Sequence, residues 1–226
     1  VDFLESLASF LQSNYQLSSN NTFITGMSNG GEICYSLAFD GSNVFKAFAP
    51  VAGSVFPNGT INNLFNPNIP APMFVTHGYN DNVTFYDGDP NDQFWGPYLG
   101  VDTLVNFWIN ENSLTNFIVD TFPDLNNDGN ITISKKHFSS LTNNEVWLYA
   151  HNNGHNWGDS DIVIEQEIWD FFSLYINNST QVIELNENRN LISIYNLLGQ
   201  EHLNSKNTFL FYQYDNGEVE KKIIID

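Results

Sequence analysis

Three short segments that are apolar at nearly every position, each bounded by turn residues, most constrain the fold. They are 46–53 (KAFAPVAG), 72–78 (PMFVTHG) and 145–151 (EVWLYAH). Such runs are typical of strands buried on both faces, as in a parallel sheet covered by helices on each side. Segments with the helical spacing of apolar residues accompany them, at 2–14, 101–112 and 161–176. The sequence therefore predicts an α/β fold with a doubly wound sheet.

The chain divides into a large domain and a small one. Its 226 residues, 42% of them hydrophobic, can bury one substantial core and leave room for a short module. After the polar stretch 177–180 (NNST) the composition changes to short β-prone pieces separated by Asn, Ser and Gly. We therefore place an α/β domain at 1–178 and a β-rich module at 179–226.

Charge and cysteine content exclude several classes of function. With 26 acidic and 7 basic residues the formal net charge is −19, which repels nucleic acid and anionic lipid. No segment reaches the roughly 18 apolar residues that a membrane span needs. The single cysteine, Cys34, cannot form an internal disulfide, and its apolar neighbours indicate a core position. We expect no nucleic-acid partner and no membrane span.

The segment from Gly26 to Gly30 has the form G-x-S-x-G, with Ser28 at its centre. A short β run (TFIT) precedes it and a helical pattern follows it, which are the two contexts that a nucleophile elbow requires. Small residues are expected on either side of the serine because neighbouring elements crowd a tight turn. The pattern favours Ser28 as a nucleophile and the N–H of Asn29 as a donor to an oxyanion.

A nucleophilic serine needs a general base and a group that orients the base. Asp81 follows the strand segment 72–78, and His155 follows 145–151, so both lie at strand ends. Their order along the chain, serine then acid then histidine, is the one that accompanies a nucleophile elbow. Asp81 is also typical of a simple turn former. His151 is the rival base, but it still belongs to the strand, whereas Gly154 lets a loop carry His155 back over the sheet.

Three separated motifs, ITGMSNGGEICYSLA, HGYNDNVTFYDG and NGHNW, resemble the polyhydroxybutyrate depolymerase and feruloyl esterase group of α/β-hydrolases over roughly residues 1–176. The resemblance implies a nucleophilic Ser28, an orienting Asp81 and a general base at His155. It also implies that Trp157 lines the site, and that Trp108 has a packing role.

Two departures from that family matter. Gly158 stands where the family usually has proline, so the local loop is less rigid. The early strands of the family, and the loop that donates the second oxyanion N–H, have no counterpart before Ser28. We therefore expect that the N-terminal strands are missing, and that an unpaired apolar edge at TFIT favours aggregation.

The last 45 residues or so, with LISIYNLLGQ and a terminal KKIIID, resemble the C-terminal sorting domain of the type IX secretion system of Bacteroidetes. The resemblance implies a secreted or cell-surface protein and the type IX secretion machinery as a partner. A generic β appendage is the alternative.

Two further segments carry weaker signals. Asp124-x-Asn126-x-Asp128-Gly129 begins like a calcium loop, but its twelfth position is Lys135, so we favour a tight turn between two strands and expect no metal. The loop 85–98, which contains Trp95, either forms a substrate wall or is an exposed connection.

Three functions remain in competition. The first is a secreted serine carboxylic-ester hydrolase, without a cofactor, acting on an extracellular ester or polymer such as a polyhydroxyalkanoate or a feruloylated or acetylated polysaccharide. The second is a serine peptidase of the prolyl-oligopeptidase type. The third is a surface binding module whose triad is no longer active. The M-S-N-G-G and G-H-x-W motifs favour the esterase over the peptidase.

Overall fold

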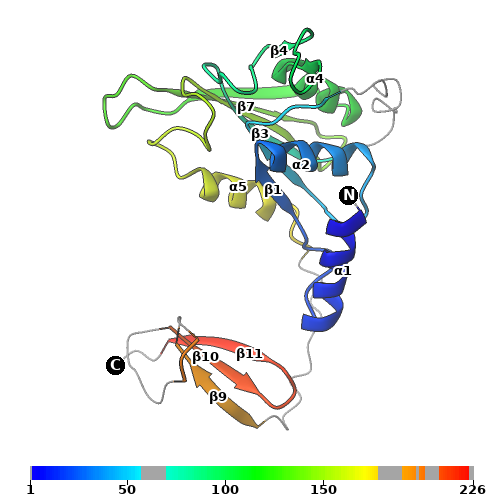
Figure 1. Cartoon of the computed structure of the whole chain (residues 1–226), viewed down its shortest axis with the longest axis vertical. Coiled ribbons are helices and arrows are strands. Elements are labelled where there is room, and N and C mark those ends of the chain that lie inside the picture. The colour runs from blue at the N-terminus through cyan, green and yellow to red at the C-terminus, as the bar shows by residue number, and fades with distance from the viewer. Residues whose placement is uncertain (1, 57–69, 178–189, 197–198, 202–208, 224–226) are drawn as a thin grey trace. The chain divides into compact units, whose positions relative to one another are not determined.

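The computed structural model describes residues 2–56, 70–177, 190–196, 199–201 and 209–223 (Figure 1). The chain forms two compact units, one of residues 1–10 and 18–177 and the other of residues 11–17 and 178–226. The predicted boundary between residues 178 and 179 lies outside the described residues.

The larger unit is built on a six-stranded sheet with the order β1-β2-β3-β8-β7-β6. Its strands are β1 (Ile24–Met27), β2 (Phe48–Val51), β3 (Met73–Gly78), β6 (Asn116–Thr121), β7 (Thr132–Phe138) and β8 (Val146–His151). Strands β1, β2, β3 and β8 run parallel to one another. Strands β6 and β7 add an antiparallel hairpin beside β8. The α/β prediction is confirmed, with a mixed sheet.

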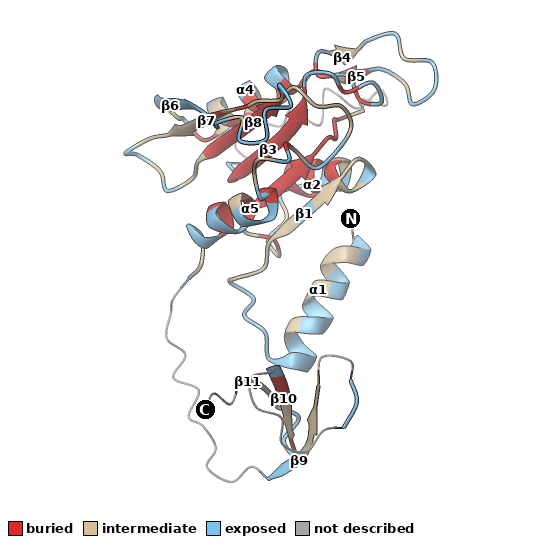
Figure 2. Cartoon of the chain, turned by 90° about the vertical axis from the view of Figure 1, so that its left-hand side faces the viewer, coloured by how far each residue is buried: buried red, intermediate tan, exposed pale blue. Residues whose placement is uncertain are grey.

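Helices cover both faces of this sheet, because alternate residues of its central strands point in opposite directions. Val75 of β3 belongs to a core with α2 (Asn29–Phe39) and α4 (Val101–Glu111). Phe74 belongs to a second core with α5 (Ile164–Ser173). Figure 2 shows the buried strands of this unit between these helices. The doubly wound arrangement is therefore confirmed.

Two features differ from the sequence prediction. Helix α5 begins at Ile164 rather than at residue 161, because Ile162 still belongs to a turn in which its N–H donates to the Asp159 carbonyl at 3.2 Å. The sequence indicated a turn between two strands at residues 124–129 but did not locate the strands β6 and β7 on either side of it. Every residue of β6 is exposed, and β7 carries Lys135 and Lys136, so neither strand has the apolar run of a buried strand.

The predicted N-terminal helix is present as α1 (Asp2–Tyr15), but none of its residues is buried. Leu4 and Ala8 pack against the core, while Phe3 and Phe10 are 74% and 58% exposed. Among the described residues, β1 pairs only with β2 and so forms one edge of the sheet. The expected unpaired edge at this strand is therefore observed.

The smaller unit contains an antiparallel sheet with the order β11-β10-β9. Its strands are β9 (Leu191–Tyr195), β10 (Phe209–Tyr214) and β11 (Val219–Ile223). Leu210 is fully buried, and Tyr214 is 9% exposed. The prediction of a β-rich C-terminal segment is confirmed. None of the helices in the described ranges has the length and apolar character needed to cross a membrane.

Candidate active site

Ser28 occupies a sharp turn between a strand and a helix. Strand β1 ends at Met27, α2 begins at Asn29, and Ser28 between them has φ 56° and ψ −121°. This left-handed φ is costly for a residue with a side chain and is typical of functional turns. The turn is held by the backbone, since the Ser28 N–H donates to the Val51 carbonyl at 2.9 Å and the Ser28 carbonyl accepts from Glu32 N–H at 3.0 Å. The predicted strand, serine and helix succession is present.

The glycines around Ser28 are required to different extents. A Cβ on Gly26 would lie 2.7 to 2.8 Å from the backbone of Gly30. One on Gly31 would lie 2.8 Å from the Val51 carbonyl oxygen, whereas one on Gly30 would meet no atom within 4 Å. The expected crowding is therefore confirmed before the serine. After the serine it falls on Gly31, because the first turn of α2 packs against β2 there and Gly30 faces open space.

Asn29 is exposed and is the first residue of α2. The first N–H groups of a helix have no partner within the helix, and the helix dipole adds partial positive charge there. The backbone N–H of Asn29 therefore belongs to the class of donors that can stabilise an oxyanion, directly beside Ser28.

Asp81 lies in the turn after β3, and its carboxylate is enclosed by donors. Oδ1 accepts the N–H groups of Val83 at 2.8 Å and Thr84 at 2.9 Å. Oδ2 accepts from His155 Nδ1 at 2.8 Å. Burial opposes ionisation, but hydrogen bonds from His77, His155 and the two backbone N–H groups outweigh it and lower the Asp81 pKa to about 2. Asp81 is both the turn former and the partner of His155.

The loop that carries His155 is joined directly to the loop of Asp81. Tyr79 N–H donates to the His151 carbonyl at 2.7 Å, and Asn80 N–H donates to the Asn153 carbonyl at 3.2 Å. A Cβ on Gly78 would collide with the carbonyl oxygens of Asn153 and Gly154. The two loops approach this closely only because residue 78 has no side chain, so backbone contacts determine where the acid meets the histidine.

The rival base, His151, lies in a different environment. It is fully buried at the end of β8, and neither of its ring nitrogens has a hydrogen-bond partner among the residues that the structure describes. Burial, with a smaller contribution from His77, lowers its pKa to about 4. His137 lies on β7, where its ring contacts Phe117. His202 is outside the described residues. Of the described histidines, His155 alone has its ring nitrogen within 3 Å of the Asp81 carboxylate.

Ser28, Asp81 and His155 follow the carboxyl ends of β1, β3 and β8, which are parallel strands of one sheet. This is the edge at which open α/β sheets place their sites. The structure joins Asp81 to His155 by a hydrogen bond. Within the described part of the chain, no hydrogen bond joins the Ser28 hydroxyl to His155. The Asp81 and His155 pair is therefore assembled, while the serine is placed by its backbone.

The two tryptophans predicted to contact substrate are exposed. Trp157 follows His155 by two residues and is 41% exposed, and Trp95 is 64% exposed. Trp95 lies in the loop between β4 (Gly88–Asp89) and β5 (Tyr98–Leu99). The backbone N–H of Trp95 donates to Asp92 Oδ1 at 2.5 Å. The loop is therefore a structured turn that carries an exposed aromatic ring.

Two sequence interpretations outside the site are confirmed. Cys34 is fully buried, and burial raises the pKa of its thiol to about 12, which makes it inert. Trp108 is fully buried, and its ring centroid lies 4.9 Å from that of Phe39 and 5.0 Å from that of Phe107.

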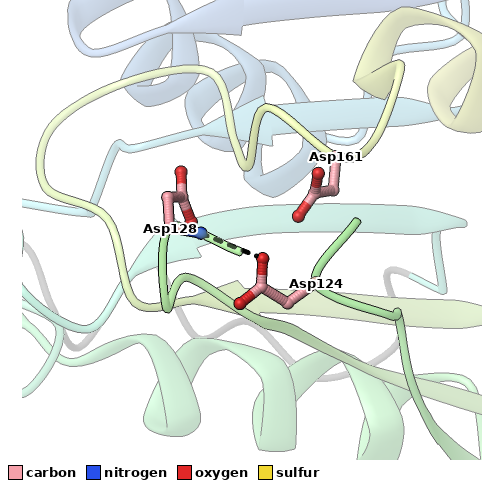
Figure 3. Close-up of side chains that lie close together, drawn as sticks. All are labelled: Asp124, Asp128 and Asp161. Carbon is pink, nitrogen blue, oxygen red and sulfur yellow. Dashed lines mark hydrogen bonds between the residues drawn. The ribbon is translucent and has the colours of Figure 1, made fainter. Parts of the chain in front are cut away.

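The acidic segment at residues 124–129 lies between two strands, as predicted, but in a loop that runs from residue 122 to residue 131 rather than in a tight turn. Asp128 N–H donates to Asp124 Oδ1 at 3.2 Å, and Gly129 N–H donates to Asp124 Oδ2 at 3.1 Å. Asp161 lies beside this segment, and carboxylate oxygens of Asp124, Asp128 and Asp161 lie within 4.8 Å of one another (Figure 3). The sequence did not indicate Asp161, because it comes from the segment after His155. Lys135 lies in β7, outside this cluster.

No family model matches the chain, and a search of curated proteins finds no match. Among solved structures, an acetyl xylan esterase from Aspergillus awamori is similar, with 11% sequence identity and a TM-score of 0.48. The alignment covers 76% of this chain and 66% of that chain, so this chain spans about two thirds of the length of that esterase.

Proposed function

We propose that the chain is a serine carboxylic-ester hydrolase, with Ser28 as nucleophile, His155 as general base, Asp81 as the group that orients the base, and the N–H of Asn29 as an oxyanion donor. The observation that carries the proposal is the 2.8 Å hydrogen bond between His155 Nδ1 and buried Asp81, at the sheet edge that also bears Ser28 in a strained turn.

The arrangement supports an acyl-enzyme mechanism. The hydrogen bond to Asp81 keeps the proton of the neutral His155 ring on Nδ1 and leaves Nε2 unprotonated. Nε2 can then accept the Ser28 hydroxyl proton as the serine oxygen attacks the ester carbonyl. The Asn29 N–H donates to the resulting oxyanion. Collapse breaks the bond to the alcohol oxygen, which takes the proton from Nε2. Water then attacks the acyl-enzyme carbonyl while His155 Nε2 takes one of its protons. Collapse breaks the bond from the acyl carbon to the Ser28 oxygen, which takes that proton back from Nε2, so the acid leaves and the Ser28 hydroxyl is restored.

We place the substrates among esters derived from polymers, such as polyhydroxyalkanoates or feruloylated or acetylated polysaccharides. Exposed rings of Trp157, Trp95 and Phe94 support this class, because aromatic faces stack on sugar and phenolic rings. The net charge of −19 disfavours polyanionic substrates.

The activity test compares short p-nitrophenyl esters and methyl ferulate with a dipeptidyl p-nitroanilide. Ser28→Ala is expected to lower ester turnover on the order of 10⁴- to 10⁶-fold and to leave the fold intact. Ser36→Ala is the matched control, since Ser36 is an exposed serine of α2 whose hydroxyl donates to Glu32 O. If Ser28→Ala keeps more than about a tenth of the turnover, Ser28 is not the nucleophile. Cleavage of the anilide alone would indicate the peptidase, and cleavage of neither would indicate the binding module.

We further propose that residues 179–226 direct secretion through the type IX machinery to the cell surface or the medium. The three-stranded β9 to β11 sheet fits a small sorting module. The test is a fusion of residues 179–226 to a reporter in a bacterium that has this system. Reporter retained in the periplasm would contradict the proposal.

A further inference from the structure

His77 is a buried histidine beneath the loop of Asp81. It lies on β3, is 1% exposed, and its Nε2 atom is 2.7 Å from the Thr84 carbonyl oxygen. The same nitrogen is 3.3 Å from Asp81 Oδ2, the oxygen that accepts from His155. His77 on β3 and His155 in the loop after β8 therefore approach one carboxylate oxygen.

The contact with Thr84 determines which nitrogen of His77 carries the proton. A carbonyl oxygen can only accept a hydrogen bond, so Nε2 must be the protonated nitrogen. Its N–H then faces two acceptors, the Thr84 carbonyl and Asp81 Oδ2. Since Thr84 N–H also donates to Asp81 Oδ1, His77 holds the whole turn from Asp81 to Thr84 against β3.

We propose that His77 is a positioning residue for the Asp81 and His155 pair, which rests on the function proposed above. It acts through Asp81: by fixing the turn and adding a donor on Oδ2, it holds the carboxylate where it meets His155 Nδ1. Asp81 has no other side-chain partner among the described residues. Without His77, only backbone N–H groups to Oδ1 would set the orientation of Asp81, and Oδ2 would depend on His155 alone.

His151 provides the matched control within the same sheet. It is also fully buried, and it lies on β8 directly opposite Gly78, one residue from His77. Unlike His77, it makes no hydrogen bond through either ring nitrogen to any described residue. Replacing either imidazole by phenylalanine changes packing to a similar extent, but only the change at His77 removes a donor from the acid turn.

The test compares His77→Phe, His77→Gln and His151→Phe in the full chain. Glutamine carries an amide N–H as many bonds from Cα as imidazole Nε2, so it can restore the donor. We expect His77→Phe to lower kcat/KM for p-nitrophenyl acetate on the order of 10- to 100-fold. We expect His77→Gln to recover most of this loss and His151→Phe to lose about threefold or less. Equal losses in both phenylalanine variants, or no recovery with glutamine, would overturn the proposal.

A spectroscopic readout separates this proposal from the proposed function. The Nδ1 proton of His155, bonded to a carboxylate, should give a downfield proton NMR resonance that is lost in Asp81→Asn. We expect the resonance to persist in His151→Phe and His77→Gln, and to move upfield or disappear in folded His77→Phe. Its persistence unchanged in His77→Phe would overturn the positioning role. If wild type has no esterase activity but the resonance behaves as expected, the proposed function fails while the positioning of Asp81 stands.

Discussion

The turn of Ser28 and the paired loops of Asp81 and His155 are constructed in different ways. Ser28 is placed by a strained backbone between β1 and α2, and its neighbours need only be small. Asp81 and His155 are placed by hydrogen bonds between two loops that are far apart in the sequence. The first region is a local structure that a short motif can encode. The second exists only when β3 and β8 are paired.

The largest effect should come from the base. His155→Ala is expected to be about as severe as loss of the serine, on the order of 10⁴-fold or more in kcat, because the hydroxyl of Ser28 then has no proton acceptor. His137→Ala on β7 is the control and should keep wild-type kinetics. Steady-state kinetics with p-nitrophenyl acetate measures both. A similar loss in the two variants would leave the base unassigned.

The approach of the two loops can be broken at Gly78. Gly78→Ala should destabilise the fold by about 3 kcal/mol and separate Asp81 from His155, because its Cβ would collide with the Asn153 and Gly154 carbonyls. In Gly154→Ala the nearest atom to the new Cβ is 3.5 Å away, an ordinary contact, so this variant should be tolerated. Chemical denaturation and esterase assays measure both variants. Wild-type stability in Gly78→Ala would contradict the description of this junction.

The serine turn can be tested by a parallel pair. Gly26→Ala should cost roughly 2 to 3 kcal/mol of stability and reduce activity, because its Cβ would lie 2.7 Å from the Gly30 backbone. Gly30→Ala meets no atom within 4 Å and should fold normally. Thermal denaturation compares the two. If Gly30→Ala were the more damaging variant, the crowded position would be Gly30, after the serine, and not Gly26, before it. That outcome would contradict the description of the turn.

The smallest expected effect is the pH dependence contributed by Asp81. Its folded pKa of about 2 is below the ordinary 3.8, so its contribution is present above about pH 4 and is lost as the pH falls toward 2. This contribution amounts to roughly 2 kcal/mol of the free energy of unfolding. Urea denaturation between pH 5 and pH 2 should show it in wild type and not in Asp81→Asn. Parallel curves for the two proteins would contradict the depressed pKa.

Several features were predictable because they depend on local pattern. The apolar runs at β2, β3 and β8 indicated buried strands, and the glycine and serine spacing indicated the turn of Ser28. Order along the chain then indicated Asp81 and His155. The strands β6 and β7 were not predictable in this way, although the connection between them was. The exposed edge strand β6 has no buried face, and β7 carries Lys135 and Lys136 in place of an apolar run.

Sequence alone determined the α/β class, the turn of Ser28 and the candidate acid and base, since these follow from patterns within short segments and from the order of those segments along the chain. Only the tertiary structure showed that the preferred His155 bonds to Asp81, that His77 contacts the same carboxylate, and that Asp161 lies beside Asp124 and Asp128. The physical reason is that these contacts link residues from different strands and loops. Their distances are set by strand pairing and by the absence of a side chain at Gly78, which no pattern within a single segment records.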